Sequence, residues 1–271
     1  MIEPHGTLQD PLTMAAELRD RDVLSMVATA LRTDNLLFAY QPVVQSRDTS
    51  QIAFHEGLMR IKDPNGRVIA AKDFITQVEP NPLGREIDHK ALQLGIAALH
   101  DEPNLRLSIN MSARSVGYPA WNESLEKGLQ GRPDVAERLI LEITEASAML
   151  MPDLVTVFMD ETQDKGVSFA LDNFGAGFMS FRYLREFFFD IVKIDGQFIE
   201  DIASNRDNQV LAKSLVSISQ NFEMFTVAER VSNKQDAEYA QSIGIDCLQG
   251  YEFGAPSLER PSGAMVERLS A

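Results

Sequence analysis

The sequence predicts an α/β fold in which the strands of a closed (β/α) barrel alternate with helices packed outside it. Short apolar runs alternate with amphipathic segments of helix length along most of the chain, a pattern typical of parallel strands joined by helices. Roughly eight such strands in about 235 residues suit a closed barrel. No Pro-rich or Gly-rich linker divides the alternation. An open doubly wound sheet is the alternative interpretation.

Two apolar runs open the predicted barrel as a hairpin. The runs at 36–45 and 51–61 are separated by the polar turn SRDTS, which favours an antiparallel pair. The first strand is therefore expected to run against the others. The remaining predicted strands lie at 105–109, 138–141, 167–171, 189–192, 225–228 and 245–248. The clearest predicted helices cover 85–100, 153–165, 205–222 and 233–243.

The N-terminal region is predicted to hold a tail and one helix. Residues 1–14 contain two prolines and a glycine without apolar periodicity, so we interpret them as a tail. Residues 15–32 place apolar side chains on one side at helical spacing. We expect 15–271 to form a single barrel domain that includes this helix. The helix is a candidate relay for a signal from an upstream sensor or partner protein.

Charge and hydropathy narrow the classes of partner. The formal net charge is −15 at pH 7, and such a surface repels phosphate backbones, so no DNA or RNA duplex is expected as a partner. The N-terminus is polar, and no apolar run approaches the roughly 20 residues of a membrane span. The expected location is the cytoplasm. The single cysteine, Cys247, lies in an apolar run and is expected to be a buried small hydrophobe.

A polar residue follows each apolar run of the predicted parallel strands. In a parallel barrel these positions share the C-terminal mouth, where active sites form. A carboxylate at one strand end also suits a helix cap, but this set contains neither Ser nor Thr. In the second predicted strand, Glu56 interrupts the apolar run. The residues that follow the runs are Asn110, Glu142, Asp172, Lys193, Glu229 and Gln249.

The chemistry of this set indicates a metal-assisted phosphoester site. Carboxylate and amide oxygens, without Cys or a local His pair, suit Mg²⁺ or Mn²⁺ better than zinc. Lys193 is suited to neutralise phosphate charge or to hold the attacking water. Glu229 is suited to order that water or to act as its base.

Eight strings that contain these residues resemble the EAL domain family, bacterial phosphodiesterases that hydrolyse cyclic di-GMP to the linear dinucleotide pGpG. They occur in family order and spacing over about 36–260. The strings are YQPVV (40–44), HEGLMR (55–60), INMS (109–112), LEITE (141–145), DNFGAGFMSFRYL (172–184), VKIDGQFI (192–199), VAERV (227–231) and QGYEF (249–253). The resemblance implies a TIM-like (β/α)8 barrel with an antiparallel first strand.

The resemblance also implies a role for each site residue. Lys193 and Glu229 match positions that hold or activate the catalytic water. Gln249 matches a further active-site position, and Leu58 and Arg60 match residues that line the nucleotide pocket. The implied metal ligands are Glu56, Asn110, Glu142 and Asp172, with Asn173 at the second metal.

A flexible loop follows Asp172 and is called loop 6 in this family. Glu145 matches the glutamate that anchors this loop. In family members the loop connects metal binding to dimerisation. The resemblance therefore implies a homodimer formed through the loop 6 region.

The chain departs from the family pattern at four positions. Gly57 makes the signature EGL instead of EAL, and Asn173 stands where a second aspartate, a ligand of the second metal, is usual. Arg230 replaces a glycine, and Ser232 replaces a glutamate. Two hypotheses follow from these departures. The protein is either a metal-dependent cyclic di-GMP phosphodiesterase with a weakened second metal site, or a catalytically inactive cyclic di-GMP receptor that acts through protein contacts.

Overall fold

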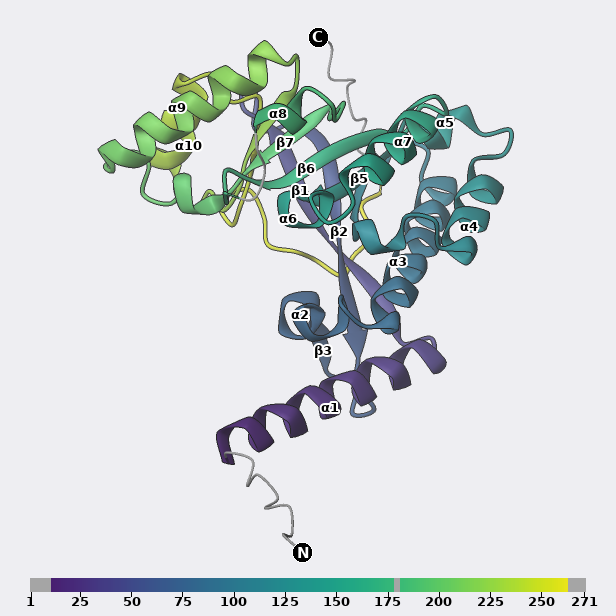
Figure 1. Cartoon of the computed structure of the whole chain (residues 1–271). Helices are drawn as coiled ribbons and strands as arrows, with labels where there is room; N and C mark the ends of the chain where they lie inside the picture. Colours follow the sequence, from purple (N-terminus) through teal and green to yellow (C-terminus); the bar gives the residue numbers. More distant parts are fainter. Residues whose placement is uncertain (1–10, 178–180, 263–271) are drawn as a thin grey trace, which may run out of the picture.

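A closed barrel of eight strands, surrounded by helices, forms the body of the described chain (Figure 1). The structure is a computed structural model and describes residues 11–177 and 181–262. The barrel strands are β1 (Leu36–Gln45), β2 (Ile52–Lys62), β4 (Leu107–Asn110), β5 (Leu139–Thr144), β6 (Ser168–Phe174), β7 (Ile191–Ile194), β8 (Phe225–Ala228) and β9 (Cys247–Gln249).

Closure of the barrel depends on β1. This strand pairs antiparallel with β2 on one side and antiparallel with β9 on the other. From β2 through β4 to β9, each barrel strand pairs in parallel with the next. The TIM-like (β/α)8 barrel with an antiparallel first strand is therefore confirmed, and the open-sheet alternative is wrong. A short strand not predicted from the sequence, β3 (Val68–Ala70), pairs antiparallel with the end of β2.

The helices cover the outside of the barrel (Figure 1). The predicted helices at 85–100, 153–165, 205–222 and 233–243 are all present, with small shifts at their ends. The first helix begins at Pro11, so residues 11–14 are helical and do not belong to a tail. Proline is compatible with a first helical turn, where it removes no helical hydrogen bond. The described helices are α1 (Pro11–Arg32), α2 (Ile75–Val78), α3 (Pro82–Asp101), α4 (Pro119–Leu129), α5 (Pro133–Ala136), α6 (Glu145–Ala148), α7 (Pro152–Gln163), α8 (Phe181–Leu184), α9 (Arg206–Asn221) and α10 (Lys234–Ser242).

The barrel interior contains an apolar layer that forms the floor of the mouth. Side chains along a strand alternate between inside and outside, so residues two apart share a face. On six of the strands, the residue two positions before the polar mouth residue belongs to one buried cluster. Cys247 is a member of this cluster and is buried, as expected. The cluster comprises Val43, Ala53, Phe54, Ile140, Ala170, Ile191, Val227 and Cys247.

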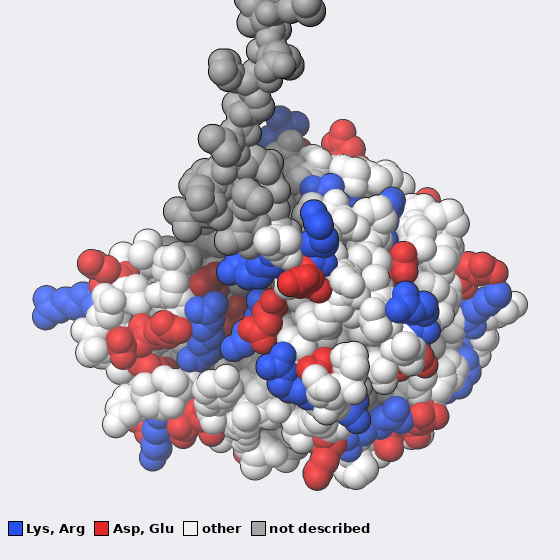
Figure 2. All heavy atoms as spheres, turned by 90° about the horizontal axis from the view of Figure 1, so that it is seen from below, with Lys and Arg blue, Asp and Glu red and all other residues white. Residues whose placement is uncertain are grey.

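The surface mixes charges of both signs. On the face seen in Figure 2, Lys and Arg side chains are interspersed with Asp and Glu side chains over the described residues. Such a mixture produces little long-range field of a single sign on that face. Within the described ranges, no helix combines the length and apolar character that crossing a lipid bilayer requires.

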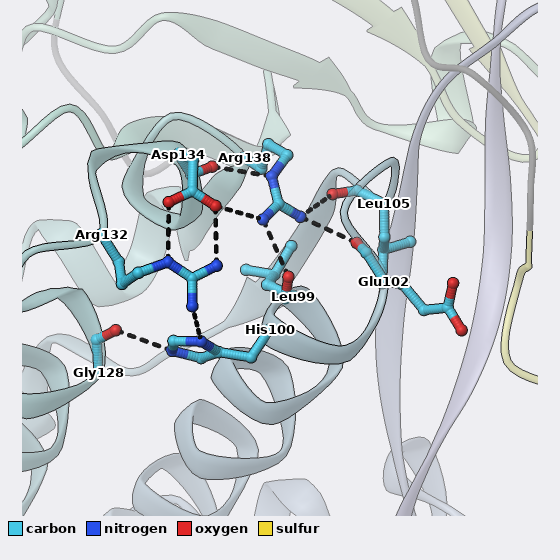
Figure 3. A network of polar contacts seen from close by, with 8 residues as sticks. All are labelled: Leu99, His100, Glu102, Leu105, Gly128, Arg132, Asp134 and Arg138. Atoms are coloured by element: carbon cyan, nitrogen blue, oxygen red, sulfur yellow. Dashed lines mark hydrogen bonds and ion pairs between the residues drawn. The ribbon is translucent and has the colours of Figure 1, made fainter.

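One buried guanidinium ties the end of α3 to the start of β5. The Arg138 side chain donates hydrogen bonds to the carbonyl oxygens of Leu99, Glu102 and Leu105 at 2.9–3.0 Å (Figure 3). The last carbonyl groups of a helix lack partners within the helix and need donors from elsewhere. Asp134 accepts from the same guanidinium at 3.3 Å. Arg138 therefore closes the α3 terminus and fixes where the chain enters β5.

We expect Arg138→Ala to lower the free energy of unfolding by about 2–3 kcal/mol, because carbonyl groups around a side chain only 13% exposed lose a charged donor. Denaturant unfolding measures this change. The matched control is Lys127→Ala, whose ion pair with Glu123 joins side chains 73% and 65% exposed. The control is expected to cost under about 1 kcal/mol. Equal losses in the two variants would contradict the structural role of Arg138.

Candidate functional site

The polar residues predicted at the strand ends are brought together at one end of the barrel. In the sheet register, Asn110 lies beside Glu142, and on the neighbouring strand Asp172 lies two residues further along, beside Thr144. Glu142, Asp172 and Glu56 each lie two positions beyond a member of the apolar interior cluster. Asn110 lies two positions beyond the buried Ser108. The side chains therefore share the barrel axis above the apolar floor.

Lys193 stands at the centre of this set. Its side chain is 1% exposed, and its Nζ atom lies 2.8 Å from Glu142 Oε2 and 3.0 Å from Glu56 Oε2. Glu229 Oε1 is 3.1 Å away, and Asp172 Oδ1 is 3.4 Å away. One buried ammonium group thus faces four carboxylates from four different strands or strand ends.

Glu56 is the most extensively hydrogen-bonded carboxylate of the site. Its Oε1 accepts a hydrogen bond from Asn110 Nδ2 at 2.8 Å. Its Oε2 accepts from Gln249 Nε2 at 2.6 Å in addition to Lys193. The Gln249 amide also approaches Gln41 Oε1 at 3.3 Å. These bonds hold Glu56 in one orientation at the middle of the mouth.

The titration of the cluster reflects an excess of negative charge. Burial, followed by the neighbouring Glu56, raises the pKa of Glu142 to about 8. Burial and Asp172 raise the pKa of Glu229 well above its usual range. Burial also acts to raise the pKa of Glu56, but Lys193 and the hydrogen bonds outweigh it and lower that pKa. The pKa of Lys193 is raised well above its usual range because the carboxylates outweigh its burial. Protons or further cations are needed to balance this cluster.

Two buried oxygens of the cluster fit a hard cation. Glu142 Oε1 and Asp172 Oδ1 accept no hydrogen bond, although Asp172 Oδ1 lies 3.4 Å from Lys193 Nζ, and buried oxygens that accept no hydrogen bond are costly. Among the described residues, no three His, Cys, Asp or Glu side chains already surround a metal-sized gap, since the carboxylates turn toward Lys193. The donor chemistry still suits Mg²⁺ or Mn²⁺, because both ions prefer oxygen ligands and accept amide oxygens such as that of Asn110.

Asn173 has a backbone conformation that few residue types adopt. Its φ angle is 58°, in the left-handed region, where Asn and Gly are much better tolerated than other residues. Its Nδ2 donates to Asp172 Oδ2 at 2.9 Å. The amide therefore lies next to the ring of carboxylates around Lys193 and orients Asp172, but it adds no charge.

The glycine of the EGL signature is explained by packing. A Cβ atom on Gly57 would lie 3.3 Å from the ring of Phe38 on β1, which is a tight contact. Gly57 pairs with Tyr40 in the antiparallel register of β1 and β2. The small residue thus lets the Phe38 ring lie close against β2.

A cavity of about 1040 Å³ opens above the ring of four carboxylates that surrounds Lys193. Its volume lies at the upper end of the range for small-molecule sites. The predicted pocket residues Leu58 and Arg60 both line it, together with Asn173 and Gln249. Lining residues also come from β1 and from the segment after β9. The mouth therefore has room for a ligand considerably larger than a single phosphate group.

Glu145, which follows β5, contacts the start of the loop that follows β6. Its side chain is buried at the start of α6, and its Oε2 accepts a hydrogen bond from the backbone N–H of Gly177 at 3.3 Å. The rest of the predicted loop 6 includes residues 178–180, which lie outside the described residues. The anchoring role of Glu145 remains a prediction that this contact supports.

Sequence reasoning missed two groups of site residues. Gln41 faces the mouth from β1 and pairs with Glu56 in the register. Asp88 on α3 accepts hydrogen bonds from the Ser112 N–H at 2.9 Å and the Ser115 hydroxyl at 2.5 Å. The latter bonds fix the turn that follows Asn110. The spacing of α3 contains no signal for this contact, because a buried aspartate on a helix resembles any other helical acid.

The fold and the site define a TIM-like barrel protein with an acidic oxygen-donor site at its C-terminal mouth. The EAL domain family matches residues 24–256 of the chain. The chain therefore belongs to the EAL domain family.

Several known proteins resemble the chain. The cyclic di-GMP phosphodiesterase PdeB of Shewanella oneidensis is 34% identical over 85% of this chain and 27% of its own length. The cyclic di-GMP phosphodiesterase PdeF of Escherichia coli is 29% identical over 89% of this chain and 32% of its own length. The chain thus spans about a quarter to a third of the length of these relatives.

Solved structures share the fold. The PaMucR phosphodiesterase in complex with c-di-GMP aligns with a TM-score of 0.76 and 26% identity, over 87% of this chain and 97% of that one. The FimX EAL domain from Pseudomonas aeruginosa bound to c-di-GMP aligns with a TM-score of 0.81 and 23% identity, over 89% and 99%.

The buried Asp88 is expected to make stability depend on pH. Burial raises its pKa from 3.8 to about 7. The folded state thus keeps a proton that the unfolded state has lost, and this contribution to stability falls as pH rises from about 4 to about 7. We expect Asp88→Asn to gain stability relative to the wild type over that range, by up to about 1.4 kcal/mol per pH unit.

Denaturant unfolding between pH 4.5 and pH 8 tests this prediction. Asp160→Asn, at an exposed position on α7, serves as the matched control. A difference between wild type and Asp88→Asn that stays constant with pH would show that Asp88 titrates normally in the folded protein.

Proposed function

We propose that the protein is a cyclic di-GMP phosphodiesterase that forms pGpG with Mg²⁺ or Mn²⁺ as cofactor. The carrying observation is the buried ring of four carboxylates around Lys193 in a chain of the EAL domain family. Two further observations support it. The relatives PdeB and PdeF are named cyclic di-GMP phosphodiesterases, and a structure 26% identical to the chain is a phosphodiesterase complex with c-di-GMP.

In the proposed reaction, water attacks one phosphorus of the cyclic dinucleotide and one P–O ester bond breaks, and the sugar oxygen that leaves takes up a proton to become a hydroxyl group. A divalent cation, when bound, withdraws charge from the phosphate and makes water a better nucleophile. Glu229 accepts the proton of the attacking water, and Lys193 stabilises the charge that develops on the phosphate oxygens. The residues that would hold the cation are Glu56, Asn110, Glu142 and Asp172, with Asn173 beside a second one.

The second candidate function is a cyclic di-GMP receptor without catalysis that acts through protein contacts. Asn173 favours it, because its uncharged amide contributes less to holding a second cation than a carboxylate would. A two-metal displacement loses rate when one ion is weakly held, by about tenfold for each 1.4 kcal/mol of lost stabilisation. In this alternative Leu58, Arg60 and Gln249 would still bind the nucleotide.

We also propose that the protein forms a homodimer through the loop 6 region. Leu150, Leu154 and Val157 are 44–56% exposed at helical spacing before and along α7, and Phe188 is 64% exposed. Gln163 at the end of α7 donates a hydrogen bond to the Phe188 carbonyl at 2.6 Å, so α7 and the segment that contains Phe188 are neighbours. Exposed apolar side chains on neighbouring segments favour a protein partner.

The proposed input comes through α1. Its first turns project beyond the barrel (Figure 1), and the family match begins only at residue 24. We propose that α1 transmits a signal from an upstream sensor or partner protein. The location in the cytoplasm remains a prediction.

The decisive assay incubates the purified protein with cyclic di-GMP in Mg²⁺, in Mn²⁺ and with a chelator, and follows pGpG by chromatography. We expect product only with metal. We expect Glu56→Ala to lower the rate more than about a hundredfold, since even outer-shell changes at metal sites cost 10–100-fold. Glu123→Ala, an exposed glutamate on α4, is the matched control and is expected to be fully active.

Calorimetric binding separates the two candidate functions. Asn173→Asp restores a carboxylate beside Asp172 and is expected to raise the rate at limiting metal. Tight binding of cyclic di-GMP without product, and without any gain from Asn173→Asp, would favour the receptor over the enzyme. If the protein neither binds cyclic di-GMP nor forms product, both candidate functions are refuted.

The double variant Leu154→Glu with Val157→Glu is expected to be monomeric, because two buried charges would be left unpaired in the proposed dimer interface. Sedimentation velocity measures the oligomeric state. The control is Leu211→Glu, a 47% exposed leucine on α9, which should remain dimeric. A monomeric wild type at every concentration, or a dimeric double variant, would contradict the proposed interface.

A further inference from the structure

Arg230 directly follows Glu229 and lines the cavity above the ring. Its φ angle is 56°, in the left-handed region. A long side chain at such an angle costs roughly 1–2 kcal/mol, and glycine would fit this backbone without strain. Strained residues of this kind concentrate at functional sites.

The stem of Arg230 is held by its neighbour Gly196. A Cβ atom on Gly196 would lie 2.6 Å from Arg230 Cγ, so only glycine leaves room for the stem to pass. The guanidinium reaches Glu200, with 3.6 Å between Arg230 Nη1 and Glu200 Oε1. These two side chains are 62% and 56% exposed, and an ion pair of that exposure and distance is weak. The guanidinium is therefore positioned but easily released.

The cavity needs a cation at this place if its ligand is anionic. Six carboxylates and three basic side chains line it among the described residues. A cyclic dinucleotide has two phosphodiester groups, each with one negative charge, and only one of them is cut in the proposed reaction. Arg60 already donates to the carbonyl oxygens of Leu58 and Met59 at 3.3 and 2.9 Å. Arg230 is the arginine in the wall whose partner is a solvent-exposed carboxylate.

We propose that Arg230 is a substrate-binding residue that exchanges Glu200 for the phosphodiester group not being cut. The inference rests on the proposed binding of cyclic di-GMP and adds a contact to it. A guanidinium presents two parallel N–H donors that match two phosphate oxygens. Because this phosphate does not react, the contact strengthens binding of the substrate and of the transition state equally, and it should act on KM and not on kcat.

The test compares Arg230→Gly, Arg230→Lys and Glu200→Gln with the wild type. The dissociation constant for cyclic di-GMP is measured with a chelator present, and KM and kcat are measured with Mg²⁺. Arg230→Gly is expected to raise the dissociation constant and KM about tenfold with kcat nearly unchanged. Arg230→Lys should fall between, because lysine keeps the charge without the paired donors. Glu200→Gln should tighten binding by removing the competing carboxylate.

Two controls keep the result interpretable. Arg230→Gly should unfold at or above the wild-type temperature, since glycine relieves the positive φ. Arg67→Gly removes another exposed, ion-paired arginine outside the cavity and should leave both constants unchanged. If the wild type binds cyclic di-GMP and Arg230→Gly binds it with the same dissociation constant, this inference is overturned and the proposed function is not. A loss confined to kcat would also overturn it. A wild type that neither binds nor cuts would overturn the proposed function and this inference together.

Discussion

The structure depends on a single buried ammonium group among four carboxylates. Parallel strands bring Glu56, Glu142, Asp172 and Glu229 to one mouth, where their mutual repulsion and desolvation oppose folding. Lys193 offsets part of that cost, and its Nζ lies within 3.4 Å of an oxygen of each. One positive charge does not balance four negative ones. The same interaction that permits the ring to fold thus leaves it with an affinity for protons and for divalent cations.

The geometry of the ring follows from the barrel and not from local sequence. Interior positions alternate, so the apolar residues Ile140, Ala170 and Ile191 lie one layer below Glu142, Asp172 and Lys193. This dry floor lowers the local dielectric constant and strengthens every charge interaction above it. Closure through the antiparallel β1 completes the wall, because Gln41 pairs with Glu56 on β2 and accepts a hydrogen bond from Gln249 on β9.

Much of this arrangement was predictable from the sequence, for one physical reason. In a parallel strand the mouth residue comes directly after the apolar run, so the positions of Asn110, Glu142 and Lys193 in the sequence predict them as mouth residues. The rule fails for Gln41, because β1 runs the other way and its mouth residue precedes its interior residue Val43. It also fails for Asp88, which reaches the site from α3. The three-residue strand β3 and the helical residues 11–14 were missed because too few residues carry the pattern in either case.

The departures from the family pattern alter charge more than conformation. Asn173 adopts a left-handed φ, a region that asparagine tolerates nearly as well as any residue except glycine. Arg230 adopts the same region at a steric cost and adds a guanidinium to the cavity wall. One change leaves a position beside the ring without charge, and the other adds positive charge at the rim. A wall that brings its own cation needs less charge from bound metal to hold an anionic ligand. The two substitutions therefore act in the same electrostatic direction, and both make the site less negative without any change to the barrel that supports it.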